Sequence, residues 1–212
     1  MEILSSQQRK KIDETNDLEF YSTPKFVYHL DANFRKNLTE LYKVEMINNC
    51  SVLDLMSSWD SYLPKNISYK KIIGHGLNKE ELERNKVLEK YWIQNFNTNQ
   101  ELPLENESFD YCLMVAAWQY LQYPEKIAEE VSRILNNNGK FIISFSNRAF
   151  WHKSPYIWTY STEEERIDYV KRILISNGFS NPKIIKKFIQ QNSIFPFFNN
   201  DPFYSIIAQK KK

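Results

Sequence analysis

The stretch Ser51–Pro64, SVLDLMSSWDSYLP, decides how the rest of the sequence is interpreted. Val52, Leu53 and Leu55 form a short apolar run without helical spacing, which is typical of a strand buried on both faces. Asp54 lies at the carboxyl end of this run, and serines follow it. In an open parallel sheet, ligands bind just beyond the carboxyl ends of the strands, near the point where strand order reverses. The stretch therefore predicts a strand, a turn and about one turn of helix, with a ligand site at the turn.

The composition describes one globular domain that needs no disulfide bonds. The 212 residues are 42% hydrophobic, which suffices for one well-buried core. The formal net charge of +2 gives no case for a nucleic-acid groove. Cys50 and Cys112 lie in apolar, strand-like surroundings and are expected to be reduced thiols. No window is apolar enough to span a membrane, and the polar first residues lack an export signal. We therefore expect a cytoplasmic monomer or homodimer that binds neither membranes nor nucleic acid.

The rest of the chain alternates strand patterns with helix patterns, which favours an α/β fold with a parallel sheet. Capping residues or a first-turn proline mark the helix starts. Among them, Asn78 with Glu81 and Thr162 with Glu165 have the spacing of capping boxes. The helices are predicted over residues 31–47, 78–88, 124–138 and 162–177, and the further strands over residues 71–77, 91–97, 111–115, 141–145, 183–189 and 203–209.

Three stretches together carry a resemblance to a known family. They are the opening stretch, LPLENESFDYCLMVAAWQYL at residues 102–121, and EEVSRILNNNGKFIISFSN at residues 129–147. The chain resembles class I, Rossmann-like S-adenosylmethionine-dependent methyltransferases of the type 11-like group, which act mostly on small molecules. The resemblance implies a three-layer α/β fold with a seven-stranded sheet, mostly parallel with an antiparallel last strand, and S-adenosyl-L-methionine as cofactor. The family's first motif has alternating glycines after its acidic residue, and DLMSSW has Met56, Ser58 and Asp60 there.

The resemblance also suggests how the chain is organised. We expect residues 1–48 to form an N-terminal polar segment with a lid or cover helix, and residues 49–212 to form the methyltransferase-like domain. Folds of this kind often place an N-terminal segment over the cofactor cleft as a lid. The helix predicted at 31–47 fits that role and fits equally well a helix that covers one face of the sheet.

The resemblance assigns most of the cofactor contacts to the ends of the first four strands. Asp54 would hold the methionine ammonium group or a water molecule on it. Gly76 stands where the family has an acidic residue that bonds the ribose hydroxyls, so Asn78 would supply one replacement bond. Asn95 matches the position that accepts the adenine amino group. The cofactor-binding residues implied in this way are Asp54, Leu55, Met56, Ser57, Ser58, Gly74, Gly76, Leu77, Asn78, Asn95, Phe96, Ala116 and Ala117.

Aromatic side chains predict the acceptor side of the site. π faces can solvate a sulfonium cation, and a general base is needed only where the acceptor loses a proton. His29 is the first choice for that base and His152 the second, although a structural histidine is the more frequent case. Trp118 and Tyr120 fit core positions equally well. The predicted substrate residues are Tyr21, Trp59, Trp118, Tyr120, Asn147, Arg148 and Trp158, and the sequence offers no metal-binding set. The apolar loop SIFPFFNNDP at residues 193–202 is expected to cap the cleft or contact a partner.

Two functions remain open at this stage. The first is transfer of a methyl group from S-adenosylmethionine to a small, aromatic or apolar acceptor by in-line displacement. The second is a non-catalytic, methyltransferase-like binding or partner protein with an eroded donor site. We favour the first, because Asp54 is retained and small residues occupy the places where backbone must approach a ligand. The chain has only four glycines, so Ser, Ala and Asn must supply those close approaches.

Overall fold

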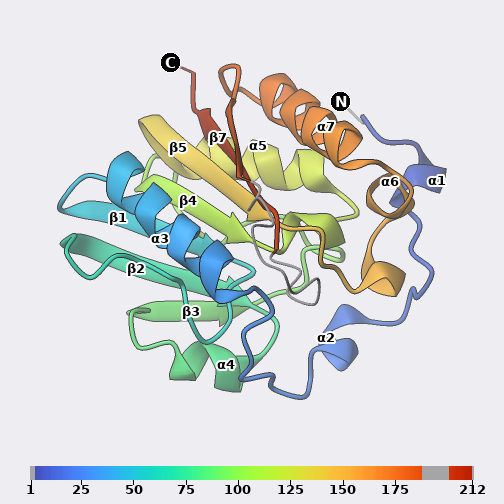
Figure 1. The fold of residues 1–212 in the computed structure, drawn as a ribbon, viewed down its shortest axis with the longest axis horizontal. Helices are drawn as coiled ribbons and strands as arrows, with labels where there is room; N and C mark the ends of the chain where they lie inside the picture. Colours follow the sequence, from blue (N-terminus) through green and yellow to red (C-terminus); the bar gives the residue numbers. More distant parts are fainter. Residues whose placement is uncertain (1–2, 188–200, 212) are drawn as a thin grey trace, which may run out of the picture.

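The computed structural model describes residues 3–187 and 201–211. Their core is a seven-stranded sheet in the order β3-β2-β1-β4-β5-β7-β6 (Figure 1). The strands from β1 to β5 pair in parallel, and β7 is antiparallel to both β5 and β6. This confirms the predicted mostly parallel sheet with an antiparallel last strand. The strands are β1 (Cys50–Leu55), β2 (Tyr69–Gly76), β3 (Lys90–Ile93), β4 (Phe109–Val115), β5 (Leu135–Phe145), β6 (Lys183–Lys187) and β7 (Phe203–Gln209).

Strand order reverses between β1 and β4. From β1 the chain proceeds outward through β2 to β3, and it then returns to the other side of β1 as β4 and β5. Val52 of β1 pairs with Ile72 on one side and with Tyr111 on the other. All six residues of β1 are buried, as the continuous apolar run predicted. The space beyond the carboxyl ends of β1 and β4 is therefore the expected ligand position of such a sheet.

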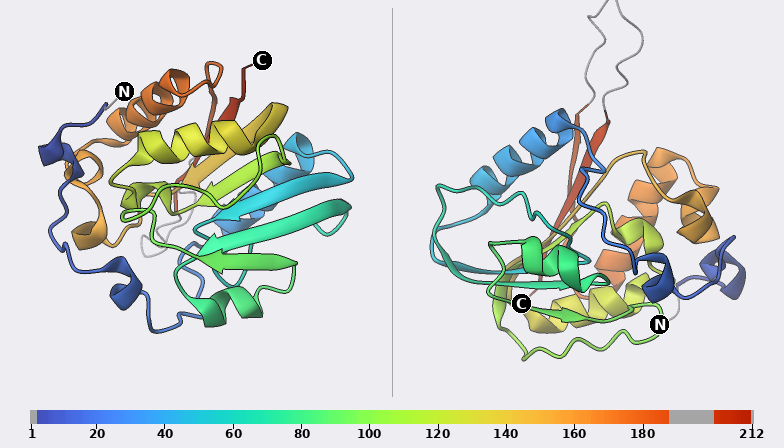
Figure 2. Two further views of the ribbon diagram at one scale, coloured as in Figure 1. Left: turned by 180° about the vertical axis from the view of Figure 1, so that it is seen from behind. Right: turned by 90° about the horizontal axis from the view of Figure 1, so that it is seen from below.

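Helices cover both faces of the sheet and complete three layers (Figure 2). The stripe of Phe34, Leu38, Leu41 and Tyr42 on α3 packs on one face, whereas α5 and α7 pack on the other. No helix in the described part of the chain is both long and apolar enough to cross a membrane. The α-helices are α1 (Ser6–Arg9), α2 (Asp17–Phe20), α3 (Ala32–Glu45), α4 (Lys79–Arg84), α5 (Pro124–Ile134), α6 (Tyr156–Thr159) and α7 (Glu163–Ser176), and two 3₁₀ turns are η1 (Trp118–Tyr120) and η2 (Trp151–Lys153).

Local capping signals predicted the ends of α7 correctly. Thr162 and Glu165 exchange both bonds of a capping box, and Gly178 follows the helix with φ of +88°. Helix α4 is shorter than the predicted 78–88. Asn78 caps it by accepting from the backbone N–H of Glu81 at 3.1 Å, but Glu81 does not return the bond.

The predicted helical turn between β1 and β2 is absent. Residues 56–68 form an irregular segment. The side chain of Asp60 accepts from the backbone N–H of Tyr62 at 2.9 Å, which closes a local turn instead of a helical one. Tyr62 has a left-handed φ of 55°, and Pro64 disfavours helical backbone at Leu63, the residue before it.

Residues 3–30, which we call the N-terminal strap, run along the edge at which the parallel strands end (Figure 1). Arg9 forms an ion pair with the buried carboxylate of Glu125 in α5. Asn16 accepts a hydrogen bond from Asn95, beyond the end of β3, at 3.4 Å. The strap is therefore tied to elements on both sides of the switch point.

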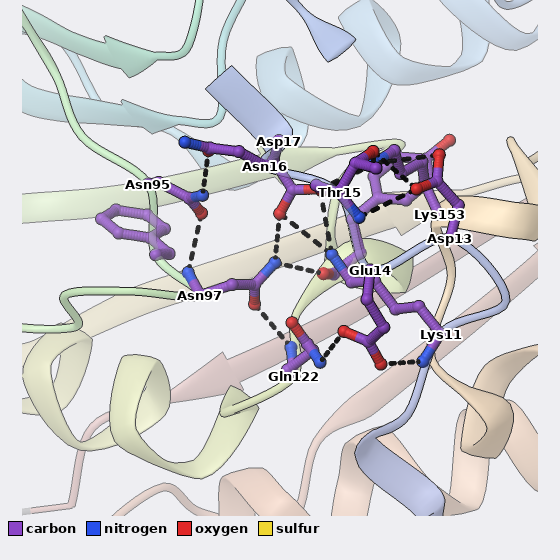
Figure 3. Close-up of polar contacts among 12 residues, drawn as sticks. Lys11, Asp13, Glu14, Thr15, Asn16, Asp17, Asn95, Asn97, Gln122 and Lys153 are labelled. Atoms are coloured by element: carbon purple, nitrogen blue, oxygen red, sulfur yellow. Dashed lines mark hydrogen bonds and ion pairs between the residues drawn. The ribbon is translucent and has the colours of Figure 1, made fainter. Parts of the chain in front are cut away.

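A buried cluster of opposite charges anchors the middle of the strap (Figure 3). The ammonium group of Lys153 is fully buried, donates to the backbone and side-chain oxygens of Thr15 at 2.8 Å, and lies 3.1 Å from Asp13. The carboxylate of Asp17 is 3.9 Å from the same ammonium group and accepts from Lys11 at 2.9 Å. Each charge has an opposite charge or a hydrogen bond beside it, as burial requires.

We predict that Lys153→Met lowers the free energy of unfolding by about 1–3 kcal/mol, because it removes the fully buried ammonium group that pairs with Asp13 and donates to both oxygens of Thr15. Urea unfolding followed by circular dichroism would measure this change. Lys171→Met is the matched control. The ammonium group of Lys171 lies 4.0 Å from the Asp168 carboxylate, in a long ion pair at the surface of α7. Its expected effect is below about 1 kcal/mol, and equal effects of the two substitutions would contradict the anchoring role.

Candidate functional site

A cavity of about 370 Å³ opens at the carboxyl ends of β1, β2 and β4. Its walls come from the segments that follow β1, β2, β4 and β5, and the strap covers it. This position is the switch point of the sheet, and the volume lies within the range of small-molecule sites. The lining residues are Tyr21, Lys25, Tyr28, His29 and Leu30 of the strap, Asp54, Met56, Ser57, Ser58, Asp60, Ser61 and Tyr62, Gly76, Leu77, Asn78 and Glu81, Val115, Ala116, Ala117, Gln119 and Tyr120, and Arg148, Ala149 and Phe150.

The carboxylate of Asp54 is the buried polar group at the end of β1. It accepts hydrogen bonds from the hydroxyls of Ser57 at 2.6 Å and Ser61 at 2.5 Å. Asn85 in turn donates to the Ser61 hydroxyl and to the Ser58 carbonyl, both at 2.9 Å. Burial raises the pKa of Asp54 to about 6, although the two serine hydrogen bonds act to lower it. Asp54 is therefore a carboxylate that titrates close to neutral pH and faces the cavity.

Left-handed backbone occurs at three residues that line the cavity. Met56 follows β1 with φ of 54°, Ala116 follows β4 with φ of 50°, and Tyr62 has φ of 55°. A side chain in this region costs about 1–2 kcal/mol per residue, so the surrounding contacts must stabilise each one. Met56 and Ala116 stand where two parallel strands end beside each other. Their conformation lets the backbone turn sharply away from the sheet and leaves the cavity open.

His75, which sequence reasoning missed, holds the turn at Met56 in place. Its Nδ1 accepts from the Met56 backbone N–H at 3.1 Å, so Nε2 carries the proton and donates to the Gln94 carbonyl at 2.8 Å. Burial lowers the pKa of His75 to about 3, which keeps the ring neutral. The ring also stacks on Phe96 with 3.8 Å between the ring centroids. No sequence pattern distinguishes this buried histidine from any other polar residue in a strand.

Gly76 is explained by the protein's own backbone. A Cβ at this position would lie 2.7 Å from the carbonyl oxygen of Ser57, so a larger residue would push the β1 turn away. The acid that sequence reasoning did not place at the site is Glu81, in the first turn of α4. Its carboxylate lines the cavity, accepts from the Lys25 backbone N–H at 2.7 Å, and accepts from the hydroxyl of Ser58. An acidic residue shortly after β2 could have indicated this role. The sequence analysis instead assigned Glu81 to the capping box of the following helix.

The rest of the cavity is aromatic. Phe150 contacts the rings of Tyr120, Tyr21 and His29, with centroids 6.2, 6.4 and 5.7 Å apart. The hydroxyl of Tyr120 accepts from the Phe150 backbone N–H at 3.0 Å. His29 stands at the mouth, and burial lowers its pKa from 6.5. Its imidazole is therefore a neutral base at neutral pH.

The structure brings together many of the residues that the sequence placed at the site. Asp54 and the segment after it reach the cavity, and so does the end of β4. Met56 lines the cavity without filling it. Asn78 also lines it, but its amide group already donates to the Tyr21 and Ser22 carbonyls. The predicted site residues that line the cavity are Tyr21, His29, Asp54, Met56, Ser57, Ser58, Gly76, Leu77, Asn78, Ala116, Ala117, Tyr120 and Arg148.

Other predicted site residues lie in the core or in neighbouring packing. Leu55, Trp118 and Trp158 are buried among the hydrophobic residues under α5 and α7, where apolar strand and helix faces meet. A Cβ on Gly74 would collide with Leu88 at 2.4 Å, so this glycine serves packing between β2 and the segment after α4. The stack on His75 described above places Phe96 in the core as well.

Predicted residues outside the core also lie away from the cavity lining. The amide of Asn95 accepts from the Asn97 backbone N–H at 2.9 Å and is covered by the strap. Trp59 packs on Tyr28 outside the cavity, with 4.4 Å between ring centroids. Asn147 and His152 are exposed. The segment predicted at 193–202 lies outside the described residues except for its last two.

Comparisons with known proteins find methyltransferases, both in sequence and in fold. The family model described as a methyltransferase domain matches residues 60–143. No protein of curated function matches the sequence. Among solved structures, one from Thermotoga maritima is described as an S-adenosylmethionine-dependent methyltransferase and possible histamine N-methyltransferase. It has 20% sequence identity and a TM-score of 0.59, with 85% of this chain and 90% of that chain covered.

Two further structures have the same fold. An S-adenosylmethionine-dependent methyltransferase from Mesorhizobium loti is 13% identical with a TM-score of 0.56, covering 81% of this chain and 96% of that chain. Phosphoethanolamine N-methyltransferase 2 of Haemonchus contortus, solved in complex with S-adenosyl-L-methionine, is 15% identical with a TM-score of 0.61, covering 87% of this chain and 54% of that chain. The methyltransferase-domain model thus matches residues 60–143, and the chain has the class I, Rossmann-like fold of S-adenosylmethionine-dependent methyltransferases.

Proposed function

We propose that this protein transfers a methyl group from S-adenosylmethionine to a small-molecule acceptor. The observation that carries the proposal is the cavity at the switch point, with the Asp54 carboxylate at its inner end and the backbone turned away at Met56 and Ala116. Met56 lines this space without filling it, and Trp59 is not among its lining residues, so the cavity is open to a ligand. The family match over residues 60–143 supports the same reaction class.

The residues present fit the donor's charged and polar groups. Asp54 offers a buried carboxylate to an ammonium group, because its second oxygen, Oδ1, accepts no hydrogen bond within the described part of the chain. The related enzymes bind the ribose hydroxyls with an acidic residue at the position that Gly76 occupies in this chain. Here Glu81 offers its carboxylate to those hydroxyls. Its oxygens take one protein donor each, and each oxygen retains further acceptor capacity. The donor would therefore lie along the segments that follow β1 and β2.

When bound, S-adenosylmethionine supplies an activated methyl group on a sulfonium cation. The protein's contribution is to hold the acceptor in line with that group and to exclude water, and orientation alone is worth about 7–11 kcal/mol of the barrier. The rings of Tyr21, Tyr120 and Phe150 provide a dry, π-rich wall near the cation. His29 is placed to accept a proton from an acceptor hydroxyl or amine, and its lowered pKa keeps it unprotonated.

The direct test is isothermal titration calorimetry of the wild-type protein with S-adenosylmethionine and S-adenosylhomocysteine. We predict one site with a dissociation constant in the micromolar range, that is, about −8 kcal/mol. Absence of both heat and a thermal shift at millimolar ligand would favour the non-catalytic alternative instead.

We predict that affinity for S-adenosylhomocysteine falls roughly tenfold between about pH 7 and about pH 5. The ligand's ammonium group binds the ionised carboxylate of Asp54, and the pKa of about 6 means that a proton competes for that carboxylate below this pH. Asp54→Asn keeps an oxygen for both serines but removes the charge, so binding weakens at neutral pH and the pH dependence disappears. 5′-Methylthioadenosine lacks the ammonium group, and its binding should not follow this profile. Unchanged affinity of Asp54→Asn for S-adenosylhomocysteine would contradict the assignment of Asp54 to the ligand's ammonium group.

We predict that Glu81→Gln removes the preference of the site for a vicinal diol. Wild-type protein should bind adenosine about tenfold more tightly than 2′,3′-dideoxyadenosine, and the variant should bind the two nearly equally. Competition against S-adenosylhomocysteine would measure both constants. Glu80→Gln is the matched control, because Glu80 lies in the same helical turn and is exposed. The same loss of preference in both variants would count against Glu81.

A further inference from the structure

Arg148 is a cation at the mouth of the cavity that donor binding leaves unused. It follows β5, and its side chain is 55% exposed. Its Nε donates to the Oδ1 of Asp201 at 2.5 Å. A guanidinium group carries five N–H donors, and the described residues provide no partner for its two terminal nitrogens. The two terminal nitrogens of the Arg148 guanidinium group can therefore donate hydrogen bonds to a ligand at the mouth of the cavity.

The guanidinium group is held in place by a buried support. Asp201 is 5% exposed, and its Oδ2 accepts from the backbone N–H of Asp31 at 2.8 Å. The backbone N–H of Asp201 donates in return to Asp31 at 2.7 Å, and Asp31 caps α3. This doubly bonded pair joins the start of α3 to the start of β7. It holds the Nε edge of the Arg148 guanidinium group, which reduces the side-chain entropy lost on binding an anion.

A flat aromatic surface lies next to this cation. Phe150 and Tyr120 stack at an interplanar angle of 28°, and Phe20 meets Phe150 edge-on at 5.4 Å between centroids. A planar ring that entered the mouth would contact these faces while its substituent reached Arg148, which precedes Phe150 by two residues. Aromatic pairs of this kind contribute about 0.5–1.5 kcal/mol beyond the buried area.

Gln119 adds a second, independent feature on the same side. It lines the cavity, is 1% exposed, and its Oε1 has no hydrogen-bond partner among the described residues. Its amide nitrogen donates to the Arg148 carbonyl at 3.4 Å, which fixes which end of the amide is the oxygen. An unpaired buried acceptor costs about 1–3 kcal/mol, and a ligand O–H or N–H would offset that cost.

Charge is distributed unevenly between the two sides of the cavity. The acids Asp54, Asp60 and Glu81 come from the end of β1 and from the segments that follow β1 and β2. On the other side, the segments after β4 and β5 contribute one charged lining residue, Arg148, whose paired acid Asp201 lies behind it. Lys25 of the strap is the second cation of the lining. An anionic group is therefore favoured beside Arg148 and disfavoured beside the acids.

We propose that the methyl acceptor is an aromatic acid. Its ring would lie against Phe150 and Tyr120, its carboxylate would bind the terminal nitrogens of Arg148, and its hydroxyl or amine would donate to Gln119. This inference rests on the proposed function, because it names the acceptor class for the same site.

The test compares 4-hydroxybenzoate with its neutral analogue 4-hydroxybenzamide by calorimetry, on the protein alone and on the protein saturated with S-adenosylhomocysteine. Wild-type protein should bind the acid at least tenfold more tightly than the amide. Arg148→Gln should remove this preference by weakening the acid while leaving the amide unchanged. Arg172→Gln removes the same charge from an exposed position on α7 and should change neither constant. Raising the salt concentration should reduce the ratio of the wild-type affinities for 4-hydroxybenzoate and 4-hydroxybenzamide.

Three outcomes would overturn the inference. They are equal affinity of wild-type protein for the two probes, equal weakening of both by Arg148→Gln, and no binding of either probe by a protein that binds S-adenosylhomocysteine. A protein that fails to bind S-adenosylhomocysteine would refute the proposed donor site instead. The titrations on the protein alone would still decide whether the mouth prefers the acid.

Discussion

The burial of the Asp54 carboxylate at the end of a strand that is covered on both faces constrains the rest of the site. A carboxylate in such a place must be hydrogen-bonded, and hydroxyls of the next few residues provide the bonds. To bring Ser57 and Ser61 back toward Asp54, the chain turns sharply at Met56 and cannot continue as a helix. The cavity is the space left in front of this returning segment. The need of a buried carboxylate for hydrogen bonds thereby shapes the cavity.

Neighbouring strands support that turn from the side. His75 of β2 accepts the Met56 N–H, and Gly76 lets the Ser57 carbonyl approach to a distance that a Cβ would prevent. The neutral state of His75 matters here, because a protonated ring could not accept that bond. Gly74 and Gly76 therefore serve close contacts within the protein, and serine and alanine line the cavity beside Gly76. This division explains how a fold that usually relies on glycine is built with so little of it.

The N-terminal strap and α3 lie in different parts of the fold. Helix α3 covers a sheet face with an apolar stripe, whereas the strap before it supplies Tyr21, Lys25 and His29 to the cavity. Its anchoring through the buried ammonium group of Lys153 makes the strap part of the folded body. The acids lie on the β1–β2 side of the cavity and Arg148 on the β4–β5 side. The proposed donor and acceptor positions therefore lie on opposite sides of the switch point.

The sequence by itself predicted the order of the strands and principal helices and the strand that carries Asp54, because apolar periodicity and capping residues act over a few neighbouring positions. The boundary between α5 and β5 was wrong, since α5 ends at Ile134 and β5 begins at Leu135, inside the helix predicted to extend to residue 138. It also identified the segments after β1 and β4 as cavity walls, since the carboxyl ends of parallel strands meet at one edge. Only the tertiary structure decided which aromatic residues face the cavity. Trp118 and Trp158 lie in the core, whereas Tyr21 and Tyr120 line the site, and side-chain type does not distinguish these positions. Glu81, Gln119 and the Arg148–Asp201 pair likewise depend on contacts between segments far apart in the chain, which no local pattern encodes.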